Sequence, residues 1–146
     1  MKFLLCFSLI TVFLSSLAQT KKAKLCRLEI YDVETGLRET VFKSKKHFEA
    51  PNWSLDGEFL LFNSAGRLYK LPLDSKEPEI LDTGFAKQCN NDHGFTPDGQ
   101  GIILSNNDPS RKTGPTTGGT SRIYSIPIKG GLPKLLTPKA ASYWHG

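Results

Sequence analysis

The stretch Asn52–Phe62, with the sequence NWSLDGEFLLF, indicates how this chain folds. It recurs as Gly94–Leu104, GFTPDGQGIIL, and Asp98 follows Asp56 by 98 − 56 = 42 residues. In both copies an aromatic residue precedes a Ser/Thr-x-Asp-Gly turn, and a short apolar run follows the turn. These turn residues favour a tight reversal, and the apolar run is typical of a strand buried on both faces. A fixed period of about 40–45 residues indicates the blades of a β-propeller.

The two turns are expected to rest on the same local bonds. The Ser or Thr hydroxyl is expected to bond the backbone two residues further on. Proline suits the second turn position, which Pro97 satisfies and Leu55 only tolerates. The Asp-Gly pair adds the local side-chain bond that short hairpins favour. The predicted structural turn residues are therefore Asp56, Gly57, Asp98 and Gly99.

A second pair of segments repeats further along the chain. Arg67–Leu73, RLYKLPL, matches Arg122–Ile128, RIYSIPI, at a spacing of 122 − 67 = 55 residues. This spacing exceeds the first by 55 − 42 = 13 residues. The difference falls in Asn106–Thr120, which is rich in Gly, Pro, Thr and Asn. Since insertions in repeats map to loops on one face, this segment is predicted to be a loop.

The N-terminal 18 residues are predicted to be a secretory signal peptide. Lys2 gives a positive start, residues 3–14 are apolar, and Ser16-Leu17-Ala18 fits a small-x-small cleavage site. The apolar core is too short to span a bilayer comfortably, and no other stretch is apolar enough to do so. We therefore expect a periplasmic or secreted protein with no membrane span after cleavage.

The exported part carries a modest positive charge. Removing Lys2 leaves 18 basic and 14 acidic residues, a formal charge of +4. The basic clusters at residues 21–24 and 43–46 fit solvated faces better than a nucleic-acid site, so no nucleic-acid partner is expected. Cys26 and Cys89 either pair in an oxidising compartment or remain unpaired small hydrophobes.

The predicted fold class is all-β, a partial β-propeller after the signal peptide. It has about two four-stranded antiparallel blades plus part of a third, and residues 19–146 form one incomplete propeller. The blade parts are expected at about 24–43, 47–83 and 91–137, with the start of the next at 141–146. Propellers need roughly four to eight blades to close. The chain is therefore interpreted as an N-terminal piece of a longer protein or a truncated gene model.

The pattern Trp-Ser-x-Asp-Gly, followed by Leu-Tyr-x-Leu-Pro-Leu-Asp, resembles the TolB-like β-propeller repeat, a WD-related repeat of periplasmic proteins. The resemblance covers about residues 24–146. Residues 47–53, 89–94 and 142–146 resemble one exported subfamily that is often labelled transport- or translocation-associated. The resemblance implies a six-bladed ring in a chain about twice this long.

Polar and aromatic residues gather in the segments that enter the innermost strands, which lie at one mouth of a propeller channel. Histidine, carboxylate and amide groups at such a mouth could bind a metal or act as acid and base on a sugar, and related propellers include carbohydrate lyases. His93 and His145 are the alternative catalytic residues. No His-x-x-x-His or Cys-x-x-Cys spacing occurs, so neither a metal nor a cofactor is expected. The ligand-binding candidates are His47, Glu49, Asn52, Asn91, Asp92, His93, Trp144 and His145.

These features favour a binding protein over an enzyme. The first hypothesis is an exported scaffold for a protein or carbohydrate partner. The alternatives are a lyase-like glycan-processing enzyme with a histidine-lined channel mouth and a non-functional truncated fragment.

Overall fold

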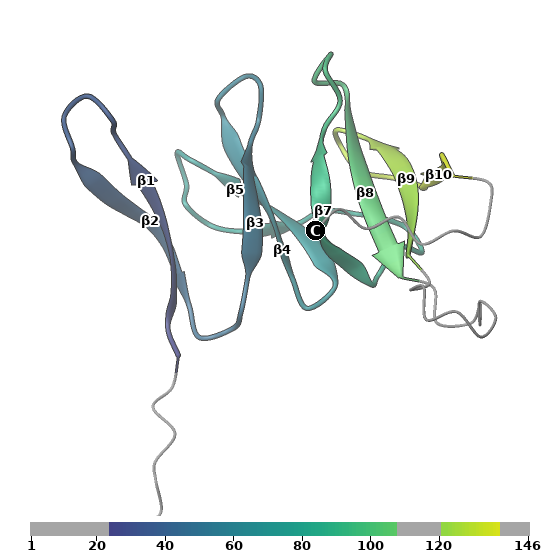
Figure 1. Ribbon diagram of the computed structural model, residues 1–146, viewed down its shortest axis with the longest axis horizontal. Coiled ribbons are helices and arrows are strands. Elements are labelled where there is room, and N and C mark those ends of the chain that lie inside the picture. Colours follow the sequence, from purple (N-terminus) through teal and green to yellow (C-terminus); the bar gives the residue numbers. More distant parts are fainter. Residues whose placement is uncertain (1–23, 108–120, 138–146) are drawn as a thin grey trace, which may run out of the picture.

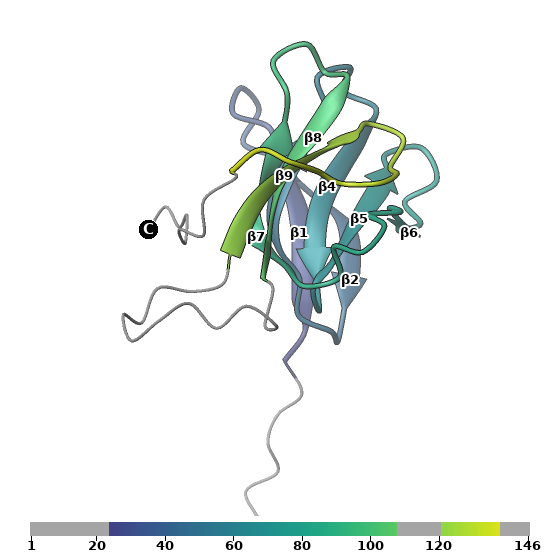
Figure 2. The same cartoon turned by 90° about the vertical axis from the view of Figure 1, so that its right-hand side faces the viewer.

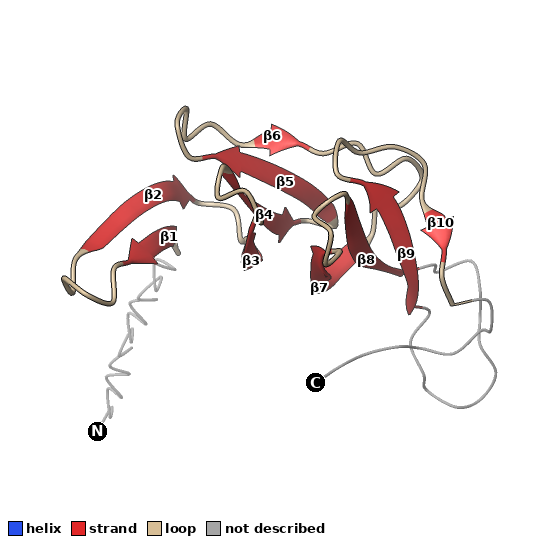
Figure 3. Cartoon of the chain, turned by 90° about the horizontal axis from the view of Figure 1, so that it is seen from above, coloured by secondary structure: helices blue, strands red, loops and turns tan. Residues whose placement is uncertain are grey.

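The computed structural model describes residues 24–107 and 121–137. The predicted signal peptide, most of the predicted loop insertion and the predicted start of a further blade at 141–146 lie outside these residues. The described chain forms ten strands in three antiparallel sheets that stand side by side (Figure 1). Seen from above, the sheets fan out in chain order, as propeller blades do (Figure 3).

The first sheet has two strands, β1 (Cys26–Tyr31) and β2 (Arg38–Ser44). The hairpin between them closes on Asp32, whose Oδ1 accepts the N–H groups of Glu34 and Thr35, each at 2.9 Å. These two bonds lower the pKa of the Asp32 carboxyl, the bond from Thr35 more than that from Glu34.

The second and third sheets have four strands each, and sequential strands are neighbours in both. The second contains β3 (Glu49–Trp53), β4 (Phe59–Ser64), β5 (Arg67–Pro72) and β6 (Glu79–Ile80). The third contains β7 (Cys89–Phe95), β8 (Gly101–Asn107), β9 (Ser121–Pro127) and β10 (Lys134–Leu135). The innermost strands β3 and β7 lie on one side of the fan, and the short strands β6 and β10 lie on the other (Figure 3).

Two apolar clusters fill the spaces between the sheets. One joins the first sheet to the second through Leu28 and Val41 against Leu60 and Phe62. The other joins the second to the third, with members that include Phe59, Leu61, Leu68, Ile102 and Leu104. Strand β4 supplies residues to both clusters and is buried on both faces because a sheet covers it on each side. The predicted fold class, an all-β partial propeller, is confirmed.

The predicted bond of the turn hydroxyl was wrong in its partner. The hydroxyl oxygens of Ser54 and Thr96 accept backbone N–H groups five residues on, from Phe59 at 3.0 Å and Gly101 at 2.8 Å. The side chains that bond two residues on are Asp56 and Asp98, whose Oδ1 atoms accept the N–H groups of Glu58 and Gln100. The aspartate is in the middle of the turn, so its carboxylate reaches the closing N–H first.

Among residues 24–107 and 121–137 there is no helix with the length and apolar character needed to cross a membrane.

Candidate functional site

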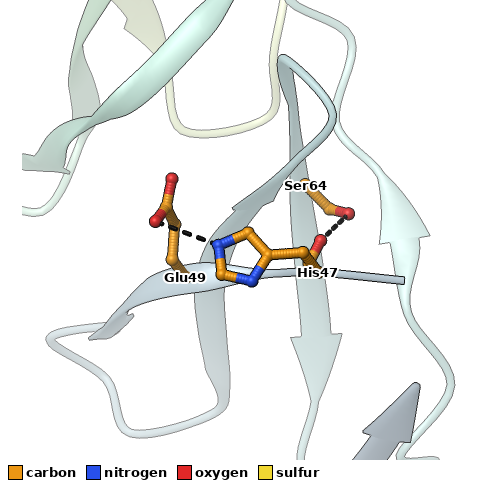
Figure 4. Close-up of polar contacts among 3 residues, drawn as sticks. All are labelled: His47, Glu49 and Ser64. Atoms are coloured by element: carbon orange, nitrogen blue, oxygen red, sulfur yellow. Dashed lines mark hydrogen bonds and ion pairs between the residues drawn. The ribbon is translucent and has the colours of Figure 1, made fainter. Parts of the chain in front are cut away.

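His47 and Glu49 form an exposed pair at the start of the second sheet. His47 lies in the connection from β2 to β3, and Glu49 is the first residue of β3. The Nε2 of His47 lies 3.2 Å from the Oε2 of Glu49, and 76% of the His47 side chain is exposed. The hydroxyl of Ser64 donates to the His47 carbonyl at 2.5 Å and so holds the backbone (Figure 4). This pair is accessible to a partner in solvent.

Asn52 joins the innermost strands of two neighbouring sheets. Its Nδ2 donates to the carbonyl of Ala50 in β3 and to the carbonyl of His93 in β7, both at 3.1 Å. The register of β3 against β4 shifts between Glu49 and Asn52, and Ala50 has a φ of 52°. A non-glycine residue with positive φ is uncommon, and here it accompanies a bulge that turns the Ala50 carbonyl to the Asn52 amide.

His93 lies within β7, opposite Leu104 of β8. Both of its ring nitrogens are buried, and neither has a hydrogen-bond partner among the described residues. Burial lowers the pKa of His93, while the carbonyls of Asn90, Ala50 and Leu61 and the carboxylate of Asp92 act in the opposite direction. The net effect is a neutral imidazole at neutral pH.

Asn91 and Asp92 lie in the bulge of β7, where the register shifts between Cys89 and His93. Asn91 is exposed. The N–H of Asp92 donates to Asn90 Oδ1 at 2.9 Å, and its Oδ2 is buried without a partner. Asn90 also donates from its Nδ2 to Ser105 Oγ at 3.1 Å, so it fixes the shape of the bulge. Sequence reasoning missed Asn90 because no repeat position marks it.

The structure brings the predicted site residues together in two groups. His47 pairs with Glu49, and Asn52 contacts His93. The two histidines do not occupy equivalent positions, because His93 is inside its strand whereas His47 precedes one. Trp144 and His145 lie outside the described residues. No cluster of three or more His, Cys, Asp or Glu side chains suited to a metal occurs in the described part of the chain.

The hairpin turns of the second and third sheets lie next to each other at the end of the fan. A hollow of about 310 Å³ opens between them, lined by residues that include Leu55, Asp56, Phe95 and Asp98. Bonds from the hydroxyl and backbone of each turn lower the pKa of both carboxyls, those from Ser54 and Glu58 for Asp56 and those from Thr96 and Gln100 for Asp98. Both turns therefore present ionised carboxylates, and each is held by bonds within its own hairpin.

Cys26 and Cys89 are both free thiols. They pack against different clusters, Cys26 against the one between the first and second sheets and Cys89 within the one between the second and third.

Comparison with known proteins places this geometry among solved propellers. An uncharacterized protein of Agrobacterium fabrum is 45% identical over 120 residues, covering 82% of this chain and 38% of that protein. The structure of a presumed TolB from Agrobacterium tumefaciens is 44% identical with a TM-score of 0.70, covering 82% of this chain and 40% of that one. No protein-family model matches the chain.

A more distant structure, TolB from Acinetobacter baumannii, is 22% identical with a TM-score of 0.60, and it shows the fold alone. The alignment covers 78% of this chain and 27% of the Acinetobacter protein. The chain thus spans about two fifths of the length of the curated relative that it matches.

Proposed function

We propose that this chain, which has the TolB-like β-propeller fold, belongs to an exported scaffold that binds a protein or glycan partner. The surface for this partner is the inner side of the fan, where the chain enters β3 and β7. The carrying observation is that polar side chains face solvent there, His47, Glu49 and Asn91 above all. The middle strand β4 next to them is almost wholly apolar and buried. A transport- or translocation-associated role is one form that such a scaffold takes.

The state of His93 favours binding over catalysis. A general acid or base must reach the proton that it transfers. Both nitrogens of His93 are buried between two sheets. The exposed histidine, His47, already contacts Glu49. These two environments support recognition by the exposed pair and a structural role for the buried ring.

The test compares two classes of partner with matched variants of the full chain. One probe is sedimentation with purified peptidoglycan, and the other is cross-linking to periplasmic proteins from a photoreactive residue at position 91. The double variant His47→Ala/Glu49→Ala is expected to weaken the stronger of the two interactions about tenfold. Glu77→Ala removes an exposed charge near the outer strand β6 and serves as the control.

Two results would overturn this proposal. One is equal binding by the double variant and the wild type. The other is cleavage of a polysaccharide that is lost in His93→Ala, because that would establish an enzyme.

A further inference from the structure

The aromatic residues that open the two hairpins occupy the same place in their sheets but have different surroundings. Trp53 pairs with Leu60, and Phe95 pairs with Ile102, at the same step of the ladder. Phe95 packs edge-on against Phe59 of the preceding sheet, with ring centroids 5.7 Å apart. Trp53 is 48% exposed, and its Nε1 donates only to the Gly57 carbonyl of its own turn, at 3.2 Å.

The first sheet lacks a counterpart of Phe59 among the described residues. Phe59 opens β4, the strand that pairs with the inner edge of β5. Strand β1 corresponds to β5, because Arg27-Leu28 matches Arg67-Leu68 and both leucines are buried against the following sheet. In the described chain β1 pairs with β2 alone. One edge of β1 therefore presents unpaired backbone groups on the side that lies next to Trp53.

We propose that the open edge of β1 and the exposed ring of Trp53 form a docking surface for a β-hairpin. The hairpin comes from the part of a TolB-length polypeptide that lies outside the region matched here. Its pairing strand adds to β1, and the first residue of that strand rests on the Trp53 ring as Phe59 rests on Phe95. This inference concerns assembly and is independent of the proposed partner surface.

Two observations identify this occupant. The match covers 38% of the curated relative, so about three fifths of that protein lies outside it and can supply strands. A second copy of the chain has no suitable hairpin to give from its described residues, because β4 and β8 already have a neighbour on each side. Unpaired edges favour strand addition, and the apolar cluster under Leu28 continues toward Trp53.

The second sheet specifies the chemistry of the missing strand. In β4 the first and third residues, Phe59 and Leu61, face the following sheet and are buried there. The docked strand therefore carries large apolar side chains at its first and third positions. The first covers Trp53, and the third covers the adjoining apolar surface of β4 near Phe62. Polar residues at these positions would leave the indole wet.

The experiment follows Trp53 by fluorescence in the full chain with Trp144→Phe, which leaves one tryptophan. The probe is the polypeptide of the Agrobacterium fabrum relative that lies outside the 120 matched residues. On mixing, the emission should move to shorter wavelength and acrylamide quenching should fall about threefold, because the indole becomes buried. Trp53→Ala, followed by a label on Cys26, should weaken binding about tenfold. Leu55→Ala, which alters a neighbouring side chain that is 65% exposed, should not.

A second variant covers failure of the probe to fold. Residues 49–66 are duplicated directly before Cys26, in place of residues 1–25, so that a copy of β3 and β4 runs through Ala65-Gly66 into β1. This graft should protect Trp53 in the same way. The proposal is wrong if Trp53 stays as accessible as in the parent chain both with the probe and in the graft. It is also wrong if Trp53 of the unmixed chain becomes protected as its concentration rises, because a second copy would then cover the surface.

Discussion

The second and third sheets share a strand order and a turn, yet their exposed and buried residues differ on one face. The leading face of a sheet is defined here as the face toward the next sheet in chain order. On the second sheet, Leu68 and Leu81 of this face are 0% and 4% exposed beneath the third sheet. Their counterparts on the third sheet, Ile123 and Leu136, are half-buried and 44% exposed. Figure 2 views the molecule from the side of the third sheet. Burial in this fold is thus set by the neighbouring sheet more than by the position in the repeat.

The same face also differs in chemistry. Phe59 and Lys70 of the second sheet lie together, with the Lys70 Nζ 4.5 Å from the centre of the Phe59 ring. Burial lowers the pKa of Lys70, and the charges of Asp56 and Glu79 oppose that shift. The third sheet has Gly101 and Ser125 at these places, and a hollow of about 480 Å³ lies over them. The two sheets are therefore one backbone design with different capacity to fill a junction.

The largest test of this comparison is truncation of the matched pair Leu68 and Ile123. Leu68→Ala should lower the free energy of unfolding by about 3 kcal/mol, because it opens a cavity between two packed sheets. Ile123→Ala should cost about 1 kcal/mol, since its side chain is only half-buried. Urea unfolding followed by circular dichroism measures both. Equal losses would mean that position in the repeat, and not the neighbouring sheet, sets the contribution.

The next largest effect tests what the two sheets share, the closing glycine of the turn. Gly57 and Gly99 have φ values of 77° and 68°, in the left-handed region. Gly57→Ala and Gly99→Ala should each cost about 1–2 kcal/mol, because a Cβ is strained there. Gly99→Ala should cost slightly more, since its Cβ would lie 3.3 Å from Leu55 Cδ1. The same urea titration serves, and a neutral result for either variant would show that its turn can change shape.

A smaller effect is expected from pH at the junction of the two sheets. The folded-state pKa of His93 is below its ordinary value of 6.5, so the unfolded chain binds the proton more readily. Stability should therefore be complete above pH 6.5 and should decline as the pH falls below it. His93→Gln should flatten this part of the profile, whereas His47→Gln, at the exposed histidine, should leave it in place. A wild-type profile that is flat between pH 7 and pH 5 would contradict the assigned burial.

The strand positions could be predicted from the sequence because turn residues and apolar alternation are local signals. The relation between His47 and His93 could not, since it depends on the bulges of β3 and β7. From Glu49 to Asn52 is three steps opposite two on β4, whereas from Cys89 to His93 is four steps opposite two on β8. The extra residue moves His93 into its strand. The exposure of Trp53 was equally hidden, because it depends on strands that no local pattern of this chain contains.

The smallest perturbation sharpens the comparison at its junction without changing any packing. Burial raises the pKa of Cys89 to about 11, and Arg67 only partly offsets it. At pH 8 about one thiol in a thousand is then ionised, and the thiolate is the reactive form. In a Cys6→Ser background, Cys26 should react with a maleimide at least about tenfold faster than Cys89, because it is only partly buried. Denaturant should remove the difference. Similar rates for the two thiols under native conditions would mean that the second and third sheets separate readily, and that the buried leading face is only transiently covered.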